Sequence, residues 1–266
     1  MLFAAQAAPA AEVCRYSGTT SYAGSVAVET KAATVNGETS VDVAARVNAK
    51  SFGFVDWQYL YQEIGTWRDG ELQRIGVNHR YSLAGFIRRQ QWDVFDRTRD
   101  GLAAYRVQAN SLADFQTKHP GFVEHWSPVA FGQPWLPDYA RAGPERRADL
   151  DLPAAEMPAG IGTPLTLGFF WVRWLGRAER TVPLFLPGFK RNTRVDVQVV
   201  PVGVEANGLL HVRSSVRHPQ LSETEVSTAD AWIAPDHHLL RVTFDARSDH
   251  ASAQGELRLD GCTGSP

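Results

Sequence analysis

Alternating apolar and polar positions mark a pair of long strands between residues 57 and 81. Aromatic side chains at Trp57, Tyr59 and Tyr61 recur at every second residue, which is the period of a β-strand. Asp69-Gly70 predicts a tight hairpin turn between the strands, because glycine accepts the positive φ that such a turn requires. Large side chains occur on both faces of this hairpin. We therefore expect one face to pack on a core and the other to line a second surface.

The same two-residue period recurs along most of the chain. Turn signals separate the alternating segments at residues 36–37, 100–101, 207–208 and 235–236, as expected for successive hairpins. No alternation of strands with helices of the βαβ type is present, so a doubly wound fold is not expected. The sequence predicts an all-β fold, a highly curved antiparallel sheet or barrel of long hairpins with one ordered excursion rich in proline and aromatic residues.

That excursion spans residues 110–163. Proline recurs there every few residues, which excludes long regular strands and helices. A disordered linker would contain few aromatic residues, whereas this segment contains Phe122, His125, Trp126, Phe131, Trp135 and Tyr139. We expect it to be ordered and to fold back on the sheet, within a single β domain of residues 12–266.

Residues 165–186 form the most hydrophobic stretch. Their glycines and their β-branched and aromatic residues favour a strand over a helix, while the run 169–175 fits either structure, because periodicity does not separate a short apolar strand from a buried helix.

Charge and hydropathy exclude two classes of partner. The net charge of −2 gives no electrostatic footprint for nucleic acid. No apolar run reaches the length of about 18 residues that a membrane-spanning helix needs, so no membrane span is expected.

The first residues and the two cysteines indicate export. Residues 1–11 read as a signal-peptide remnant with an Ala-x-Ala arrangement, or else as a disordered leader. Cys14 and Cys262 lie near opposite ends of the chain, and the first and last strands of β domains often pair. We therefore predict a disulfide between them and a periplasmic or secreted location. Two buried free thiols are the alternative.

Known catalytic and cofactor motifs are absent from the sequence. It contains no Walker loop, no Gly-x-Gly-x-x-Gly, no Gly-x-Ser-x-Gly and no His-Glu-x-x-His. His237-His238 are adjacent, and adjacent strand residues point to opposite faces. We therefore predict no metal site and no cofactor.

Glu63 is the best single candidate for acid–base chemistry, because it lies among aromatic residues on the strand at 57–67. A glycosidase would need a second carboxyl group about 5–10 Å away. The simpler interpretation of Glu63 is a partner for an arginine or lysine on a neighbouring strand. His125 is the next candidate, and its simpler role is a hydrogen bond to loop backbone.

The spacing Trp57-x-Tyr59-x3-Glu63-x3-Trp67-x-Asp69-Gly70-x-Leu72 resembles that of an uncharacterised family of exported proteobacterial β-proteins, a domain of unknown function. Members carry a tyrosine-rich strand, then Glu-x-Trp-x-Asp-Gly-x-Leu, and later a His/Trp element that residues 124–128 resemble. Here the spacing between Glu63 and Trp67 is longer, which implies a bulge. Residues 231–236 are similar to the closing hairpin of a related exported family. The resemblance covers about half of the chain. It implies a curved antiparallel sheet or barrel in the periplasm, like that of lipoprotein carriers, and no catalytic residue.

Three functions fit these observations. The first is a carrier for a hydrophobic or amphipathic, lipid-like molecule. The second is a carbohydrate-active enzyme that uses Glu63, His125 or Asp138, and the third is an accessory subunit that contacts an envelope protein partner. An apolar cavity would favour the first, two inward carboxylates in an open groove the second, and a flat exposed aromatic patch the third. The candidate ligand-binding residues are Trp57, Tyr59, Tyr61, Glu63, Trp67, His125, Trp126, Trp135 and Tyr139.

Overall fold

The structure, a computed structural model, describes residues 11–21, 24–51, 55–84, 86–109, 145–153, 162–186, 193–217, 226–247 and 252–264. Within these ranges, fifteen strands form one sheet. The first nine are β1 (Glu12–Thr20), β2 (Gly24–Val35), β3 (Glu38–Ser51), β4 (Val55–Arg68), β5 (Glu71–Leu83), β6 (Phe86–Thr98), β7 (Gly101–Ala109), β8 (Glu145–Arg146) and β9 (Leu152–Pro153). The others are β10 (Arg180–Leu186), β11 (Thr193–Val204), β12 (Leu210–Arg217), β13 (Val226–Ile233), β14 (Leu239–Arg247) and β15 (Ser252–Thr263).

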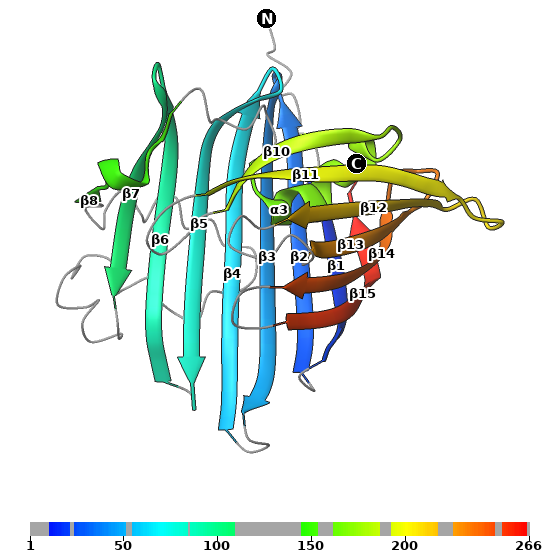
Figure 1. Cartoon of the computed structure of the whole chain (residues 1–266), viewed down its shortest axis with the longest axis horizontal. Coiled ribbons are helices and arrows are strands. Elements are labelled where there is room, and N and C mark those ends of the chain that lie inside the picture. Colours follow the sequence, from blue (N-terminus) through cyan, green and yellow to red (C-terminus); the bar gives the residue numbers. More distant parts are fainter. Residues whose placement is uncertain are drawn as a thin grey trace, which may run out of the picture.

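The sheet is antiparallel and follows the order β10-β11-β12-β13-β14-β15-β1-β2-β3-β4-β5-β6-β7-β8, with β9 beside β7. The first strand therefore pairs with the last, and all other neighbours along this path up to β7 are consecutive in the sequence. Figure 1 shows the sheet curling so that β10–β15 run across the direction of β2–β6, with β10 and β11 in front of the upper part of β3–β5. The predicted all-β fold, a highly curved antiparallel sheet of long hairpins, is confirmed.

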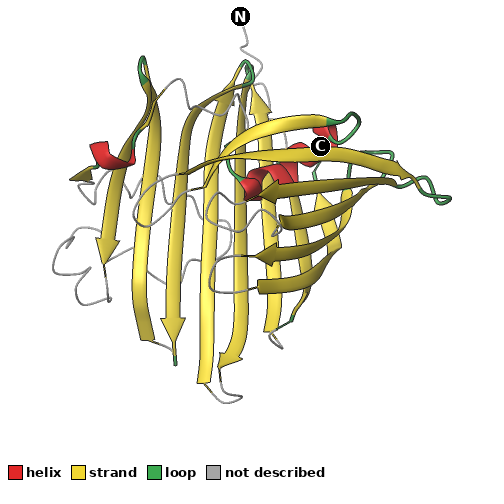
Figure 2. Ribbon diagram, viewed as in Figure 1, coloured by secondary structure: helices red, strands yellow, loops and turns green. Residues whose placement is uncertain are grey.

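Local backbone preferences explain the long hairpins. Asn36 and Gly37 have φ of 51° and 79°, and Asp69 and Gly70 have φ of 53° and 78°. Two consecutive positive φ values are typical of the two-residue turn whose twist matches that of the flanking strands. The predicted turns of the β2–β3 and β4–β5 hairpins are thus confirmed, and Figure 2 shows how little of the described chain is not strand.

The main correction concerns residues 164–175. The sequence favours a strand here, but the chain forms a helical segment of α3 (Pro164–Thr166), the π-helix η4 (Leu167–Trp171) and α4 (Val172–Leu175). Pro164 occupies the first helical position, where its missing N–H costs nothing. A helix in which apolar side chains predominate belongs in a protein core, and this one, with Arg173 as its one charged residue, lies between the two crossing parts of the sheet. The strand predicted within residues 165–186 begins only at Arg180.

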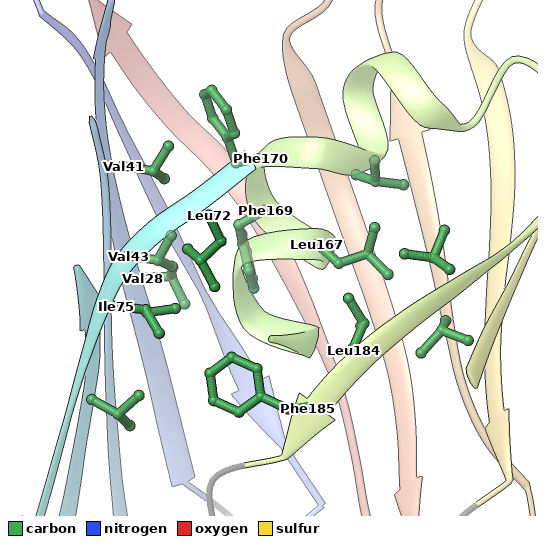
Figure 3. Close-up of a cluster of buried hydrophobic side chains, with 14 of the residues drawn as sticks. Val28, Val41, Val43, Leu72, Ile75, Leu167, Phe169, Phe170, Leu184 and Phe185 are labelled. Carbon is green, nitrogen blue, oxygen red and sulfur yellow. The ribbon is translucent and has the colours of Figure 1, made fainter. Parts of the chain in front are cut away.

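The core forms around this helical segment. Leu167, Phe169 and Phe170 contribute to one buried cluster that includes side chains from both parts of the sheet. Figure 3 shows them between one wall of β2, β3 and β5 and the chain of β10. The labelled wall residues are Val28, Val41, Val43, Leu72 and Ile75, and those of β10 are Leu184 and Phe185. The helical segment therefore occupies the interior of the curled sheet.

The described part of the proline-rich excursion, residues 145–153, lies against the sheet. β8, the short helix η2 (Ala148–Leu150) and β9 lie against β7. Leu150 and Leu152 are buried there, and the Asp151 carboxylate accepts a hydrogen bond of 2.8 Å from the Ala104 N–H. Residues 110–144 and 154–161 lie outside the described residues.

Candidate ligand-binding site

An aromatic row runs along the concave face of β4. Trp57, Tyr59, Tyr61 and Glu63 lie on the same face because side chains two residues apart on a strand point the same way. Trp57, Tyr59 and Tyr61 are half-buried, whereas Glu63 is fully buried. The rings of Tyr59 and Tyr61 are stacked, with centroids 6.3 Å apart. The row thus leads from partly accessible rings to a carboxyl group with no exposed surface.

Register brings His79 of β5 into this row. His79 pairs directly with Tyr61 across the hairpin. Its Nδ1 is 2.7 Å from the Tyr59 hydroxyl, and its ring meets the Tyr61 ring edge-on with centroids 4.5 Å apart. Counting residues outward from the Asp69-Gly70 turn would place Asn78 opposite Tyr61, so the sequence pattern alone does not bring His79 into the row. A bulge at Thr66/Trp67 shifts the pairing by one residue.

Glu63 holds the N-terminus of the helical segment 164–175. Its carboxylate accepts hydrogen bonds from the Thr163 hydroxyl, from the Thr166 N–H at 3.2 Å and from the Tyr61 hydroxyl at 2.6 Å. A carboxylate at a helix N-terminus satisfies free N–H groups and interacts favourably with the helix dipole. Burial nevertheless raises the pKa of Glu63 to about 7, and the three hydrogen bonds only partly oppose that effect.

A second buried carboxylate lies on the same face. Asp93 of β6 pairs with Val77, which in turn pairs with Glu63. The Arg106 guanidinium donates to both of its oxygens, at 2.6 and 2.9 Å, and Gln91 Nε2 donates at 2.7 Å. Burial raises the pKa of Asp93, while Arg106 lowers it. Gln91 is also buried, and its Oε1 has no hydrogen-bond partner among the described residues.

Replacing Glu63 with glutamine should change how stability depends on pH. The folded pKa of about 7 lies above the ordinary value of 4.5, so the folded protein binds this proton more tightly than the unfolded chain does. The resulting stabilisation is complete below about pH 4.5 and is lost as the pH rises through 7. Between pH 5 and pH 8, the Glu63→Gln variant should therefore gain about 2 kcal/mol of unfolding free energy relative to the wild type.

Urea denaturation at both pH values measures this difference. Asp42, whose burial raises its pKa to about 6, is present in both proteins and cancels from the comparison. Glu71→Gln is the matched control, because Glu71 is an exposed carboxylate on the same hairpin. Equal pH dependence in the wild type and the Glu63→Gln variant would contradict the assignment.

The remaining candidate residues have different positions. Trp67 is buried in the core, where its ring packs edge-on against Trp171 at 5.4 Å and lies over Gly65. A Cβ on Gly65 would approach that ring within 2.1 Å, so only glycine fits beneath it. His125, Trp126, Trp135 and Tyr139, and also Asp138, lie outside the described residues.

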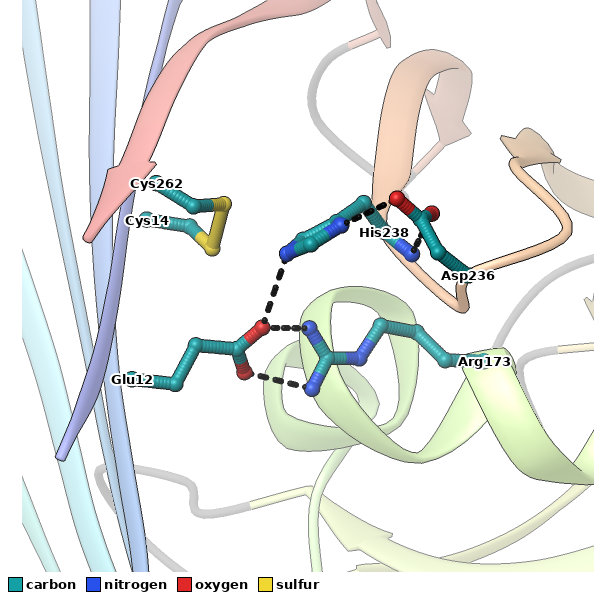
Figure 4. Close-up of a disulfide and its surroundings, with 6 residues drawn as sticks. All are labelled: Glu12, Cys14, Arg173, Asp236, His238 and Cys262. Carbon is teal, nitrogen blue, oxygen red and sulfur yellow. Dashed lines mark hydrogen bonds and ion pairs between the residues drawn. A yellow bond between two sulfur atoms is a disulfide. The ribbon is translucent and has the colours of Figure 1, made fainter. Parts of the chain in front are cut away.

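The predicted disulfide is confirmed. Cys14 and Cys262 are bonded, with an S–S distance of 2.00 Å, and they pair directly between β1 and β15. Beside them, Arg173 of α4 donates to both carboxylate oxygens of Glu12, at 2.9 and 2.6 Å (Figure 4). Arg173 and Glu12 are buried, with side chains 1% and 3% exposed. This ion pair fixes the second end of the helical segment, as Glu63 fixes the first.

The same neighbourhood does not suit a metal ion. Glu12, Cys14, His238 and Cys262 have donor atoms within 4.8 Å of one another. A cysteine binds a metal ion as its thiolate, but both sulfur atoms here are joined in the disulfide. Both oxygens of Glu12 are bound by Arg173, and His238 Nδ1 contacts the Asp236 carboxylate at 3.0 Å. The arrangement therefore stabilises the fold and leaves no set of free ligands.

An apolar cavity of about 180 Å³ lies between the helical segment and the inner face of β11–β14. Small inward side chains of β12 and β13 leave this space, since Ser214 pairs with Ala229 and Val212 with Ala231. On the helix, a Cβ at Gly168 would meet no atom within 4 Å. The wall is completed by Pro164, Leu167, Val172, Val197, Ser215, Val216, Ser227, Thr228, Val242 and Phe244. No local sequence pattern predicts this cavity, because it results from several small residues on elements far apart in the chain.

Among the described residues, no helix has the length and apolar character needed to cross a membrane. No family model matches the chain, and no curated protein matches it. Among solved structures, the fold is similar to the crystal structure of a beta-barrel-like protein of the domain of unknown function DUF1849 from Brucella abortus. The TM-score is 0.55 at 8% identity, and the match covers 98% of this chain and 100% of that chain. At this identity the likeness shows the fold alone: an uncharacterised, β-barrel-like proteobacterial protein has the same architecture.

Proposed function

We propose that this protein binds and carries a hydrophobic or amphipathic, lipid-like molecule. The observation that carries the proposal is the apolar cavity beside the helical segment. Ligand pockets are typically apolar with a few polar groups, and Ser214 and Ser227, which share the inward face of β12 and β13, are the polar side chains of this lining. A β-barrel-like fold is compatible with such a role, because barrels of this kind can enclose one ligand.

The size of the cavity favours an amphipathic ligand. A buried apolar cavity of about 150 Å³ accepts a benzene-sized group, whereas pockets for drug-sized molecules begin near 300 Å³. A space of about 180 Å³ therefore suits one apolar portion of a larger molecule. The rest of the ligand would lie against neighbouring surface, for which the aromatic row of β4 is our candidate.

Both inward carboxylates are better suited to holding the fold than to catalysis. Glu63 binds the helix N-terminus, and Asp93 is paired with Arg106. Neither lies in an open groove, since Glu63 is 0% and Asp93 is 1% exposed. This argues against the carbohydrate-active enzyme. The proposal of an accessory subunit rests on residues 122–139, which lie outside the described residues.

The compartment that we propose is the periplasm or the cell exterior. Disulfides persist in oxidising compartments and are rare in reducing ones, and the Cys14–Cys262 bond is weakly consistent with export. A carrier in that location would move an amphipathic molecule through water by shielding its apolar part.

Filling the cavity should abolish binding without unfolding the protein. In the Gly168→Leu variant the new side chain enters the cavity directly, since its Cβ meets no atom within 4 Å. Ala229→Leu fills the same space from the opposite wall. We expect each variant to weaken the binding of a decyl-chain detergent at least tenfold, as measured by calorimetry below the micellar concentration.

Thr243→Leu is the matched control for these variants. Thr243 lies between Val242 and Phe244 on β14, so its side chain points to the face opposite the cavity. It should bind the detergent as the wild type does. Unchanged affinity in both cavity variants, with their folds retained by circular dichroism, would reject the cavity as the ligand site.

A further inference from the structure

A second cavity, of about 300 Å³, lies where the end of α4 meets the β11–β12 and β13–β14 turns. Leu210, Ile233 and Pro235 give it an apolar side, whereas Arg173 and Arg177 give it a cationic side. We call it the arginine cavity. Among the described residues, none of those that line it has a carboxyl side chain.

Arg177 borders this cavity with a charge that has no carboxylate partner in the described part of the chain. Its side chain is exposed, and its Nη2 lies 3.2 Å from His237 Nε2. His237 Nδ1 lies 3.4 Å from the Arg173 carbonyl oxygen, which can only accept a hydrogen bond. Nδ1 therefore carries the ring proton, and Nε2 accepts from Arg177. His237 is neutral in this arrangement and positions the Arg177 guanidinium.

Carboxylates on the adjoining segments have partners of their own. The pairs are Asp236 with His238, Glu205 with Trp232, Glu179 with Gln198, and Glu12 with Arg173. The buried pair of Glu12 and Arg173 is neutral as a whole. The positive charge that remains at the cavity is therefore that of Arg177.

Arg173 adds a buried donor to the same wall. Its two Nη atoms bind Glu12 (Figure 4), but its Nε has no hydrogen-bond partner among the residues that the structure describes. The Arg173 side chain is 1% exposed, and a buried N–H group without a partner is costly. An acceptor bound in the cavity could satisfy this group.

The backbone at His237 is unfavourable for a histidine. Its φ is 69°, in the left-handed region that favours glycine. The residue ends the β13–β14 turn, where its N–H donates to the Ala234 carbonyl at 2.9 Å. Glycine would form this turn at a lower cost, so the turn itself does not require the imidazole. Residues held in such conformations are often functional, and the contact that this side chain adds is the one with Arg177.

We propose that the arginine cavity binds the carboxylate of a small amphipathic acid. Arg177, positioned by His237, supplies the countercharge, and the Nε–H of Arg173 supplies a further donor. Guanidinium N–H groups match the two oxygens of a carboxylate. One unbalanced positive charge matches a monoanion, and the apolar side of the cavity accommodates the apolar part of the acid.

This site is distinct from the apolar cavity of the proposed carrier function. Leu210, Val212 and Ser214 share the inward face of β12. Leu210 lines the arginine cavity and Ser214 lines the apolar one. Val212 between them is fully buried and lies against Gly176, where a Cβ would come within 2.5 Å of it. A packed contact thus separates the two spaces, and the inference does not depend on the carrier function.

Octanoate is the probe for this inference, and calorimetry is done on the full chain carrying Gly168→Leu, which fills the apolar cavity. Octanoate should bind about tenfold or more tightly than octanamide, its neutral equivalent, because a hydrogen bond to a charged group contributes more than one between neutral groups. Arg177→Met should remove this preference. Arg99→Met is the matched control, because Arg99 is an exposed arginine at the β6–β7 turn, and it should leave binding unchanged.

His237→Gly tests the positioning role. The turn then has the residue that its φ favours, so the fold should be retained. We expect octanoate binding to weaken about threefold, the loss of one modest hydrogen bond. In the Arg177→Met background the same substitution should have no further effect, whereas a histidine that only shaped the turn would change the affinity by the same factor in both backgrounds.

Several results would overturn the assignment. They are no octanoate binding, equal affinity for octanoate and octanamide, and unchanged preference in Arg177→Met. Tighter binding of octyl phosphate than of octanoate would overturn the choice of a carboxylate. If the wild type binds octanoate and Gly168→Leu abolishes that binding, the acid occupies the apolar cavity, so the arginine cavity is rejected while the carrier function stands. Circular dichroism of each variant establishes that loss of binding is not loss of fold.

Discussion

Replacing Arg173 with methionine is expected to lower the free energy of unfolding by about 3–5 kcal/mol, because it leaves the Glu12 carboxylate buried without its partner. Both side chains of this ion pair are almost fully buried, and two hydrogen bonds join them. When one member of such a pair is removed, the other stays buried and charged, and nothing compensates for its loss of hydration. His238, whose Nε2 is 3.5 Å from Glu12, also contacts Asp236 and is too distant to replace two short hydrogen bonds.

A double variant separates the loss of the ion pair itself from the cost of leaving one buried charge without a partner. Glu12→Leu combined with Arg173→Met removes both charges and should recover most of the stability lost in Arg173→Met, since apolar replacements of buried ion pairs are often neutral. Arg68→Met is the matched control, because Arg68 and Glu38 form an exposed pair expected to contribute less than about 1 kcal/mol. Urea denaturation measures all three variants. A loss in Arg173→Met as small as that in Arg68→Met would contradict the structural role of the buried pair.

Removing the disulfide should lower the free energy of unfolding by a similar amount. Cys14 and Cys262 are 248 residues apart in the sequence, so their bond restricts nearly the whole unfolded chain. The chain-entropy relation gives about 5 kcal/mol for a loop of this length. We expect the double variant Cys14→Ser/Cys262→Ser to lose most of this amount in urea denaturation, with its β1–β15 pairing retained.

Ser17→Ala is a useful control for that measurement. Ser17 donates a hydrogen bond of 2.7 Å to Asp260 across the same two strands, but it adds no covalent link, so its loss should cost about 1 kcal/mol or less. Thiol labelling of the unreduced, denatured wild type should detect no free cysteine. Equal stability of the double serine variant and the wild type would show that closing the chain contributes nothing.

The hairpins could be predicted from the sequence because their signals are local. Asn36-Gly37 and Asp69-Gly70 specify turns through the φ values that those residues accept, and alternation specifies the faces of the strands. The same reasoning placed Tyr59, Tyr61 and Glu63 on one face, as the structure has them. Pairing of the two cysteines also followed, since it needed only the adjacency of the first and last strands.

The other features of the fold and of the candidate site depend on contacts between residues far apart in the chain, which no local sequence pattern encodes. His79 joins Tyr59 only because one extra residue in β5 shifts the register by a single position. The apolar run 164–175 becomes a helix because surfaces on both sides bury it, and hydrophobicity alone is equally compatible with a strand. Glu63 contacts Thr163, which is 100 residues away in the sequence, so its role as a helix cap could not be inferred from the aromatic residues around it.

The position of β1 between β2 and β15 has a consequence for how the chain folds. The contact of Val13 with Thr263 spans almost the entire chain, and pairing of this kind is slow because a long loop must close before any contact forms. During synthesis, β1 can pair with β2 at once, but its other edge stays open until residues 252–263 have been made. An unpaired strand edge attracts other strands. β1 is therefore the segment of the nascent chain at which a chaperone would prevent mispairing.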